Sequence, residues 1–280
     1  MPIRDVVRDW IPPAALRVIR RIRGRPGPVE WEYCPEGWRT VDPRLTGWNA
    51  ESVAETQKRL WPRFLEIVRG TGPMGLFHTE PEPTGLDILG QNNILAFGYA
   101  LALTAHKKDR VSILDYGGGI GHYAVISRAL FPDLQIDYTC REVPVLCQAG
   151  REVLPDDTFV ETDEQCAGRT YDLVFCSGAL QYFEKWAETV HLLAGLTGDV
   201  FYLARVPVVF TVPSFVVVQR PYAAGYATEY LGWFFNYDEL VSTLRQSGLT
   251  LFREVLTHDA NDLENAPELC RYRAFLCRRG

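Results

Sequence analysis

The sequence predicts an α/β fold: a doubly wound, mostly parallel sheet of seven strands with an antiparallel edge strand, preceded by a helical cap. From Arg110 onward, short apolar runs alternate with helical stretches, which is typical of strands and helices around a parallel sheet. Before that point the chain carries helical patterns punctuated by Trp, Gly and Pro. We therefore expect a cap over residues 1–104 and an α/β domain over residues 105–280.

The cap begins with a basic segment. In residues 14–25, Leu16, Ile19 and Ile22 recur every three residues among five arginines, the pattern of an amphipathic helix. This helix either docks on its own domain or makes a weak contact with an anionic membrane surface. Two further helices are expected over residues 50–68, with a kink at Pro62, and over residues 93–105.

The α/β domain begins with a strand at residues 111–114, and its strands are bounded by turn residues. The last helix is marked by Asn236 as its cap, Glu239 three residues later and Gly248 at its end. The final two strands have no helix between them, which favours an antiparallel edge. Residues 211–235 are interpreted as a long, aromatic-rich loop. The expected strands cover residues 111–114, 134–139, 158–161, 173–176, 200–204, 250–255 and 272–277.

Composition excludes several classes of protein. The sequence has 47% hydrophobic and 23% charged residues, a composition that excludes an intrinsically disordered protein. Its formal net charge of −6 disfavours a nucleic-acid partner. The seven cysteines include no C-x-x-C pair, so we expect reduced thiols in a cytoplasmic protein, peripheral to the membrane at most, with no metal. No apolar run is long enough to span a bilayer, and the start lacks a secretory signal.

Residues 111–124, VSILDYGGGIGHYA, carry the strongest signal of a ligand site. An apolar strand ends in Asp115, and glycines follow at 117, 118, 119 and 121 before a helical pattern. Glycines admit positive φ and let the backbone approach a ligand, and the amides at the helix start attract anionic groups. Gly119, Gly121 and Ala124 fit a dinucleotide pattern, but there the first glycine follows the strand directly, whereas here an acid precedes the glycines.

The spacing Asp115-x-Gly117-x-Gly119-x-Gly121 resembles the first motif of class I S-adenosylmethionine-dependent methyltransferases, which have a Rossmann-like fold. The resemblance implies S-adenosylmethionine as cofactor and S-adenosylhomocysteine as product. It implies that Asp115 and the glycines, Gly118 included, hold the methionine end, with Tyr123 beside it. Glu142 would bind the ribose hydroxyls, and Asp163, or Glu161 in its place, the adenine amino group. Residues 171–183, which include Ser177, resemble the later motif beside the donor methyl.

Within this superfamily the chain resembles a methyltransferase family associated with polysaccharide and surface-glycan gene clusters. The matching runs are GW at 37–38, GWNAES at 47–52, GTGPMG at 70–75, LDYGGGIGHY at 114–123, DLVFCSGALQY at 172–182 and WFFNYDEL at 233–240. One departure is the run Ala204-Arg205-Val206-Pro207, where the family has an Asp-Arg-Thr-Pro-like run. The lost acid and hydroxyl put a glycan substrate in doubt.

For methyl transfer to oxygen, a positioned base is expected. The candidates are His122, just after the glycine loop, and His78 in the cap, with Tyr182 as a residue that positions the acceptor. Arg205 is expected to bind an anionic group. The aromatic residues Tyr222, Tyr226, Tyr230 and Trp233 would form a wall for a sugar or an apolar acceptor, although core packing or a homodimer contact would give the same composition.

The function that these residues favour is S-adenosylmethionine-dependent O-methylation of a sugar-containing or other small-metabolite acceptor in a biosynthetic pathway. Two alternatives stay open. A nicotinamide-dependent oxidoreductase or epimerase would use the same loop for NAD(P). A non-catalytic scaffold of a biosynthetic complex would bind S-adenosylmethionine without turnover.

Overall fold

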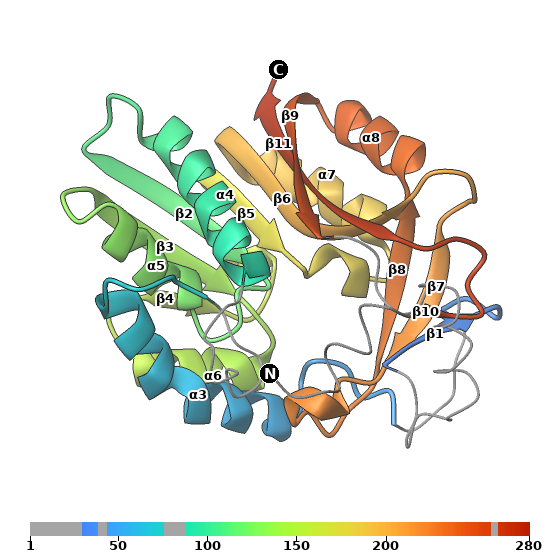
Figure 1. The fold of residues 1–280 in the computed structure, drawn as a ribbon. Helices are drawn as coiled ribbons and strands as arrows, with labels where there is room; N and C mark the ends of the chain where they lie inside the picture. The colour runs from blue at the N-terminus through green and yellow to red at the C-terminus, as the bar shows by residue number, and fades with distance from the viewer. Residues whose placement is uncertain (1–29, 39–43, 76–87, 259–262) are drawn as a thin grey trace, which may run out of the picture.

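The computed structural model describes residues 30–38, 44–75, 88–258 and 263–280 (Figure 1). The main sheet has the order β9-β11-β6-β5-β2-β3-β4. Neighbouring strands from β6 to β4 are parallel. The bounds are β2 Arg110–Tyr116, β3 Gln135–Arg141, β4 Thr158–Val160, β5 Tyr171–Ser177, β6 Thr197–Val209, β9 Leu249–His258 and β11 Arg271–Arg279. All seven expected strands are present in this sheet.

The expected antiparallel strand is β11. It pairs antiparallel with β6 on one side and with β9 on the other. It therefore lies one position inside the sheet, and β9 forms the edge. Because no helix joins β9 to β11, the two are antiparallel neighbours.

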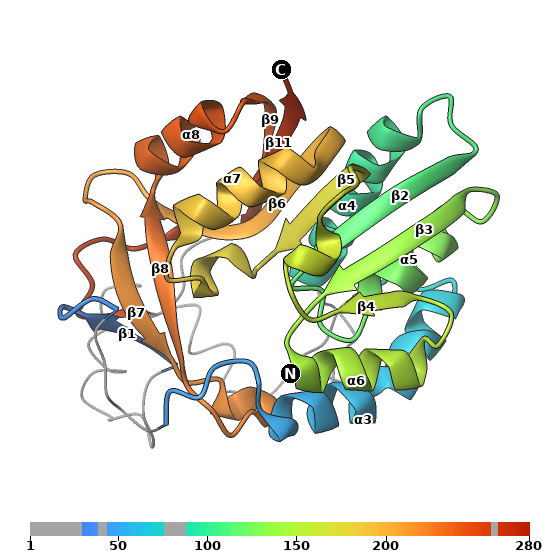
Figure 2. The same ribbon diagram turned by 180° about the vertical axis from the view of Figure 1, so that it is seen from behind.

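Helices cover both faces of the sheet (Figures 1 and 2). Alternate side chains of β5 enter two different cores, Leu173 and Phe175 on one face and Val174 and Cys176 on the other. The first core is closed by α3 (Glu51–Arg69), α4 (Ile88–Ala105), α5 (His122–Leu130) and α6 (Pro144–Val153), and the second by α7 (Trp186–Leu196) and α8 (Tyr237–Gln246). This is the layering of a doubly wound fold.

Residues 211–235 are not the loop that we expected. They contain β7 (Phe215–Gln219) and all but the last residue of β8 (Tyr230–Asn236), and these two strands pair antiparallel. β1 (Trp31–Cys34) and β10 (Leu263–Glu264) extend them into a second group of strands. The loop prediction gave too much weight to Pro213 and Pro221, which flank β7, and too little to the β-propensity of its valines. β8 pairs parallel with the end of β6, beyond the last residue that β6 pairs with β5.

The two helices expected over residues 50–68 and 93–105 are present as α3 and α4. α3 continues through Pro62, and α4 begins five residues earlier than expected, at Ile88. The basic segment at residues 14–25 lies outside the described residues. Among the helices that the structure describes, none combines the length and the apolar character needed to cross a membrane.

Asn236 caps α8 as expected. Its side-chain Oδ1 accepts a hydrogen bond from the Glu239 amide at 3.1 Å, while its Nδ2 donates to the Val212 carbonyl at 2.9 Å. The Glu239 carboxylate does not complete a capping box but accepts from the Ser214 hydroxyl.

We expect Asn236→Ala to lower the free energy of unfolding by about 1–2 kcal/mol, because it removes a helix cap and leaves a carbonyl without its donor. Urea denaturation measures this change. Gln246→Ala, at an exposed position in the last turn of the same helix, should stay within about 0.5 kcal/mol of the wild type. Equal stability of both variants would contradict the capping role.

Candidate functional site at the carboxyl ends of the strands

A cavity of about 1060 Å³ opens at the carboxyl ends of β2, β3 and β5. The second group of strands bounds its far side, because β8 packs against the loop after β5: a Cβ added at Gly232 would lie 3.6 Å from the Tyr182 ring. Open α/β sheets bind ligands in this place, and the volume suits a cofactor together with a small molecule. The candidate residues that line it are Asp115, Gly117, Gly118, Gly119, His122, Tyr123, Glu142, Ser177, Tyr182, Arg205, Tyr226 and Tyr230.

Four of the described candidates do not line this cavity, and a fifth candidate is not described. Gly121, Asp163, Tyr222 and Trp233 are not among the lining residues, and His78 lies outside the described residues. The Trp233 ring stacks on Trp38 at 5.7 Å, and its Nε1 donates to the Glu184 carbonyl. Tyr222 donates a hydrogen bond to the Glu229 carboxylate.

Asp115 is buried near the end of β2, and it lines the cavity. Its Oδ2 accepts a hydrogen bond from the Tyr138 hydroxyl at 2.5 Å. Burial raises the pKa of Asp115 to about 7; the Tyr138 hydrogen bond favours the charged form and offsets only part of this, and Glu142 adds repulsion. The site thus holds a carboxyl that ionises near neutral pH, for which a bound cation would be a partner.

The glycine loop closes tightly around this carboxyl. A Cβ added at Gly118 would lie 2.5 Å from the Asp115 carboxyl, far inside van der Waals contact. Gly119 has φ +62°, in the left-handed region, and a Cβ there would lie 2.8 Å from Oε1 of Gln57. A side chain at position 118 would therefore collide with the Asp115 carboxyl, and one at position 119 would strain the backbone and displace the Gln57 amide.

Glu142 follows β3 and supports the same loop from the other side. Its Oε1 accepts from the Gly119 amide at 3.1 Å and its Oε2 from the Val143 amide at 2.7 Å. Burial raises the pKa of Glu142 to about 7, against these two hydrogen bonds and the Arg141 charge. A carboxylate offers about four lone-pair sites, so two amide donors leave acceptor capacity toward the cavity.

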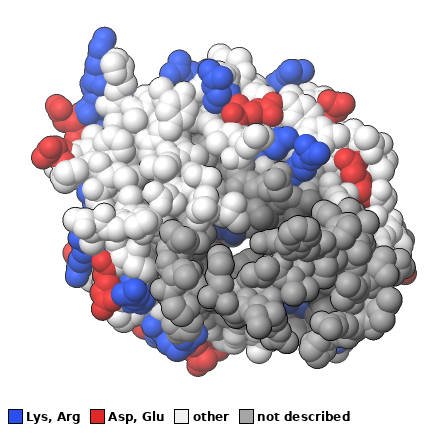
Figure 3. All heavy atoms as spheres, in the orientation of Figure 1, with Lys and Arg blue, Asp and Glu red and all other residues white. Residues whose placement is uncertain are grey.

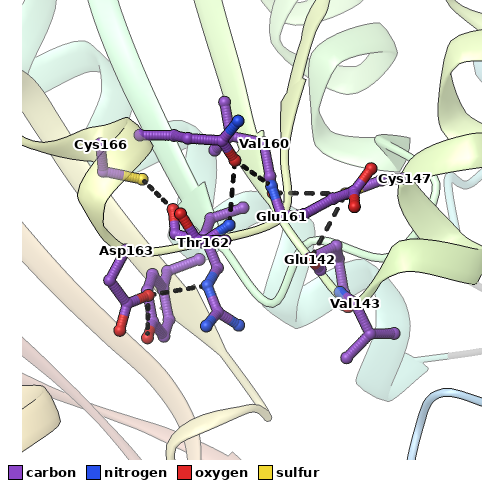
Figure 4. A network of polar contacts seen from close by, with 11 residues as sticks. Glu142, Val143, Cys147, Val160, Glu161, Thr162, Asp163 and Cys166 are labelled. Carbon is purple, nitrogen blue, oxygen red and sulfur yellow. Dashed lines mark hydrogen bonds and ion pairs between the residues drawn. The ribbon is translucent and has the colours of Figure 1, made fainter.

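Asp163 is occupied by protein partners. Its Oδ1 accepts from the Tyr116 hydroxyl at 2.9 Å and from Arg141 Nε at 2.8 Å, and the Arg141 guanidinium lies 4.9 Å from the centre of the Tyr116 ring. Figure 4 shows Asp163 and Glu142 on opposite sides of the segment 160–162. Arg141 lines the cavity, and Asp163 holds it there.

Gln57 of α3 is a loop contact that sequence reasoning missed. Its Oε1 accepts from the Ile120 amide at 3.3 Å, and it is hydrogen-bonded with Tyr226 on the far side of the cavity. Gln57 thus connects the glycine loop with Tyr226. No local pattern marks such a residue, because 63 positions separate Gln57 from Ile120.

The two candidate catalytic residues that the structure describes differ in their surroundings. The His122 ring lies at the start of α5 and packs edge-on against Trp61 and Phe64 of α3, with centroids 5.1 and 4.8 Å away. The Tyr182 hydroxyl donates to Gln219 Oε1 at 2.6 Å, and burial raises the pKa of Tyr182. Both line the cavity, His122 beside the glycine loop and Tyr182 beside β8.

An aromatic wall forms the side of the cavity away from the glycines. Trp48 stacks on Tyr230 at 4.4 Å with an interplanar angle of 6°, and Tyr182 and Tyr226 meet Trp48 edge-on. Trp48 lies in one of the family-like runs of the cap, but its place in this wall was not predicted. Within the described residues, Trp48 Nε1 and the Tyr230 hydroxyl are buried without a hydrogen-bond partner.

A second buried carboxylate, Glu229, lies beside this wall and was also missed. It is 1% exposed, accepts from Tyr222, and lies 3.5 Å from Arg220 Nε and 3.6 Å from Arg44. These partners come from two separate segments of the chain, position 44 and positions 220–222, and no motif in the sequence indicates that they meet at Glu229. Two arginines and a phenol compensate its charge.

No family model matches the chain, and neither does any curated protein. Solved structures do match. A proposed sarcosine dimethylglycine methyltransferase from Galdieria sulphuraria aligns with a TM-score of 0.50 and 12% identity over 78% of this chain and 97% of its own. The CcbJ methyltransferase from Streptomyces caelestis gives 0.49 and 14% over 82% and 99%. The magnesium protoporphyrin IX methyltransferase from Synechocystis, solved with bound S-adenosylhomocysteine, gives 0.47 and 15% over 81% and 98%.

The likeness to the Galdieria structure concerns the fold. The chain has the Rossmann-like fold of class I S-adenosylmethionine-dependent methyltransferases, as its glycine-loop motif implied. A fold of this kind can carry unrelated functions, so the function has to be argued from the site.

Proposed function

We propose that this protein is an S-adenosylmethionine-dependent methyltransferase that methylates an oxygen atom of a small-molecule acceptor. The observation that carries the proposal is the pair of buried carboxyls, Asp115 and Glu142, around a glycine loop that opens into the cavity of this fold. When bound, the cofactor supplies a methyl group on a positively charged sulfonium.

The residues around the loop fit the parts of that cofactor. Asp115 offers a carboxylate to the methionine ammonium, with Tyr123 and Ser177 lining the same part of the cavity. Glu142 keeps acceptor capacity for the ribose hydroxyls. Asp163 itself does not line the cavity. Its proposed role in adenine binding is therefore to hold Arg141 in place at the cavity wall.

The same geometry disfavours a nicotinamide cofactor. A pyrophosphate would have to approach the amides of residues 117–119, beside Asp115 and Glu142. In their ionised forms, these two carboxyls repel a phosphate anion in a poorly solvated site and attract an ammonium or a sulfonium.

Calorimetry decides between these cofactors. We expect S-adenosylhomocysteine to bind with micromolar or tighter affinity, and NAD and NADP not to bind at the same concentrations. Binding of NAD or NADP alone would refute the proposal. Binding of S-adenosylhomocysteine without methyl transfer to any compound of the surrounding pathway would instead support a non-catalytic scaffold.

The acceptor side of the cavity is suited to a molecule with a flat or apolar face. The aromatic surface comes from Trp48, Tyr182, Tyr226 and Tyr230. Two polar atoms of this surface, Trp48 Nε1 and the Tyr230 hydroxyl, have no hydrogen-bond partner among the described residues and are free to bind a ligand. A sugar ring or another small metabolite satisfies both features. A deprotonated oxygen attacks methyl carbon best, which calls for a nearby base.

His122 is the proposed base among the described residues. We expect His122→Ala to bind S-adenosylhomocysteine within about threefold of the wild type and to slow methyl transfer by about 10²- to 10⁴-fold. A methyl-transfer assay with the acceptor, run beside calorimetry, measures both effects. His191→Ala, at an exposed position whose ring contacts Ser247 just after α8, is the matched control. Unchanged turnover in His122→Ala would reduce His122 to a packing partner of Trp61 and Phe64.

The proposal also includes a homodimer. Ile88, Leu95 and Tyr99 on α4 are 66%, 56% and 44% exposed, and the surface over α4 carries few charges (Figure 3). An apolar face of this kind is typical of a protein interface. Light scattering tests it: a mass of twice 31.8 kDa supports the dimer, and a monomer at all concentrations contradicts it.

A further inference from the structure

Arg205 has a strained backbone at the wall of the cavity. It has φ +55°, although it is neither glycine nor asparagine, and it lies in the middle of β6. The pairing of β11 with β6 shifts here, since Val206 faces Arg273 but Leu203 faces Phe275. A bulge of this kind redirects one side chain, and such strain concentrates at functional sites.

The Arg205 guanidinium lies over the loop that follows β5. Its Cζ is 3.4 Å from the position of a Cβ added at Gly178, which places the guanidinium in van der Waals contact with this loop. Burial raises the pKa of Tyr123, Tyr182 and Tyr226, and the nearby Arg205 charge opposes this rise in all three. Arg205 thus lies between the glycine-loop side of the cavity and the aromatic wall.

Among the charged residues that line the cavity, Arg205 is an arginine without an ion-pair partner in the described part of the chain. The four lining acids have protein partners: Glu30 accepts from Gln219, Asp115 from Tyr138, Glu142 from two amides, and Glu229 from Tyr222. The other lining arginine, Arg141, pairs with Asp163. In the described part of the chain, no carboxylate forms an ion pair with Arg205.

We propose that Arg205 binds a carboxylate group of the acceptor, an assignment that rests on the proposed methyltransferase function. A guanidinium presents two parallel N–H donors to a carboxylate, and the nearby donors on the acceptor side are neutral phenol and indole groups. One positive charge matches a monoanion and leaves half of a phosphate dianion without compensation. The acceptor is therefore a hydroxy acid, aromatic or sugar-derived, with its carboxylate on Arg205 and its ring on the aromatic wall.

The test measures binding to wild-type protein saturated with S-adenosylhomocysteine. The probes are 4-hydroxybenzoate and glucuronate, each compared by calorimetry with its uncharged amide, and inorganic phosphate. We expect at least one carboxylate to bind about 10- to 100-fold more tightly than its amide, the range of a charge-assisted hydrogen bond. Arg205→Gln should remove this preference and Arg205→Lys should restore part of it. Arg245→Gln, at an exposed site on α8, should keep it in full.

The affinity for S-adenosylhomocysteine is measured for the same variants, because the methionine part of this ligand also carries a carboxylate that a guanidinium binds. Arg205→Gln should bind S-adenosylhomocysteine within about threefold of the wild type, with an unchanged or higher melting temperature. A loss of cofactor affinity of tenfold or more would assign Arg205 to the cofactor and overturn the acceptor proposal. The acceptor proposal would also be overturned if neither carboxylate bound the wild type more tightly than its amide, or if phosphate bound most tightly. Failure of the wild type to bind S-adenosylhomocysteine would instead refute the methyltransferase function.

Discussion

Gly119→Val is expected to abolish S-adenosylhomocysteine binding, with at least a 100-fold loss of affinity. Gly119 has φ +62°, which a β-branched residue rarely adopts, and its Cβ would lie 2.8 Å from Gln57 Oε1. Because valine disfavours this φ, the loop is expected to shift, and the Gly119 amide would then lose its hydrogen bond to Glu142. One substitution thus disrupts the loop and the acid that we assign to the ribose.

The control separates the loss of the site from the strain of a positive φ. Gly168, in the turn before β5, has φ +84° and nothing within 4 Å of an added Cβ. Gly168→Val therefore carries similar backbone strain away from the cavity. We expect both variants to melt at similar temperatures, and only Gly119→Val to lose the ligand in calorimetry. Wild-type affinity in Gly119→Val would refute the placement of the cofactor on this loop.

The main sheet could be predicted because its signals are local. In β5 the apolar run 173–176 serves both cores by simple alternation, so the run alone marks a strand. Asp115 and Glu142 each end a strand, and parallel strands bring their carboxyl ends to one edge of the sheet. The presence of both acids at the glycine loop followed from topology, without knowledge of any contact.

The contacts that complete the site depend on distant pairings. Gln57 reaches the glycine loop because α3 packs against α5, and an isolated glutamine on a helix carries no sign of this. The hairpin of β7 and β8 escaped prediction because two prolines beside a valine run indicate a loop as readily as the ends of a strand. Arg141 pairs with Asp163, 22 positions further along the chain, and no local pattern predicts this contact.

Asp115→Asn is expected to weaken S-adenosylhomocysteine binding by about 10- to 150-fold, the range expected when a hydrogen bond to a charged group loses its charge. The substitution is nearly isosteric, and the asparagine Oδ1 still accepts from the Tyr138 hydroxyl. The fold should therefore persist, and calorimetry measures the loss. Asp115→Ala should lose binding as well, but it also leaves the Tyr138 hydroxyl without its acceptor.

The dependence on pH tests the same carboxyl independently. Because burial raises the pKa of Asp115 to about 7 from 3.8, the folded protein without ligand holds a proton here that the unfolded chain releases above pH 4. The free energy of unfolding should therefore fall as the pH rises from about 4 to about 7 and level off above it. Glu142, also raised to about 7, contributes in the same direction. Asp115→Asn should show a shallower fall than the wild type in urea denaturation.

Cofactor affinity should change with pH in the opposite direction. The amino group of S-adenosylhomocysteine is cationic in this range, and it favours the ionised form of Asp115. Wild-type affinity should therefore rise by up to about tenfold per pH unit below pH 7, then level off. Asp115→Asn has no such proton to release and should lack this part of the rise. If the variant and the wild type gained affinity in parallel between pH 5.5 and 8.5, the ionisation would belong to Glu142 or the ligand, and Asp115 would not bind the ammonium group.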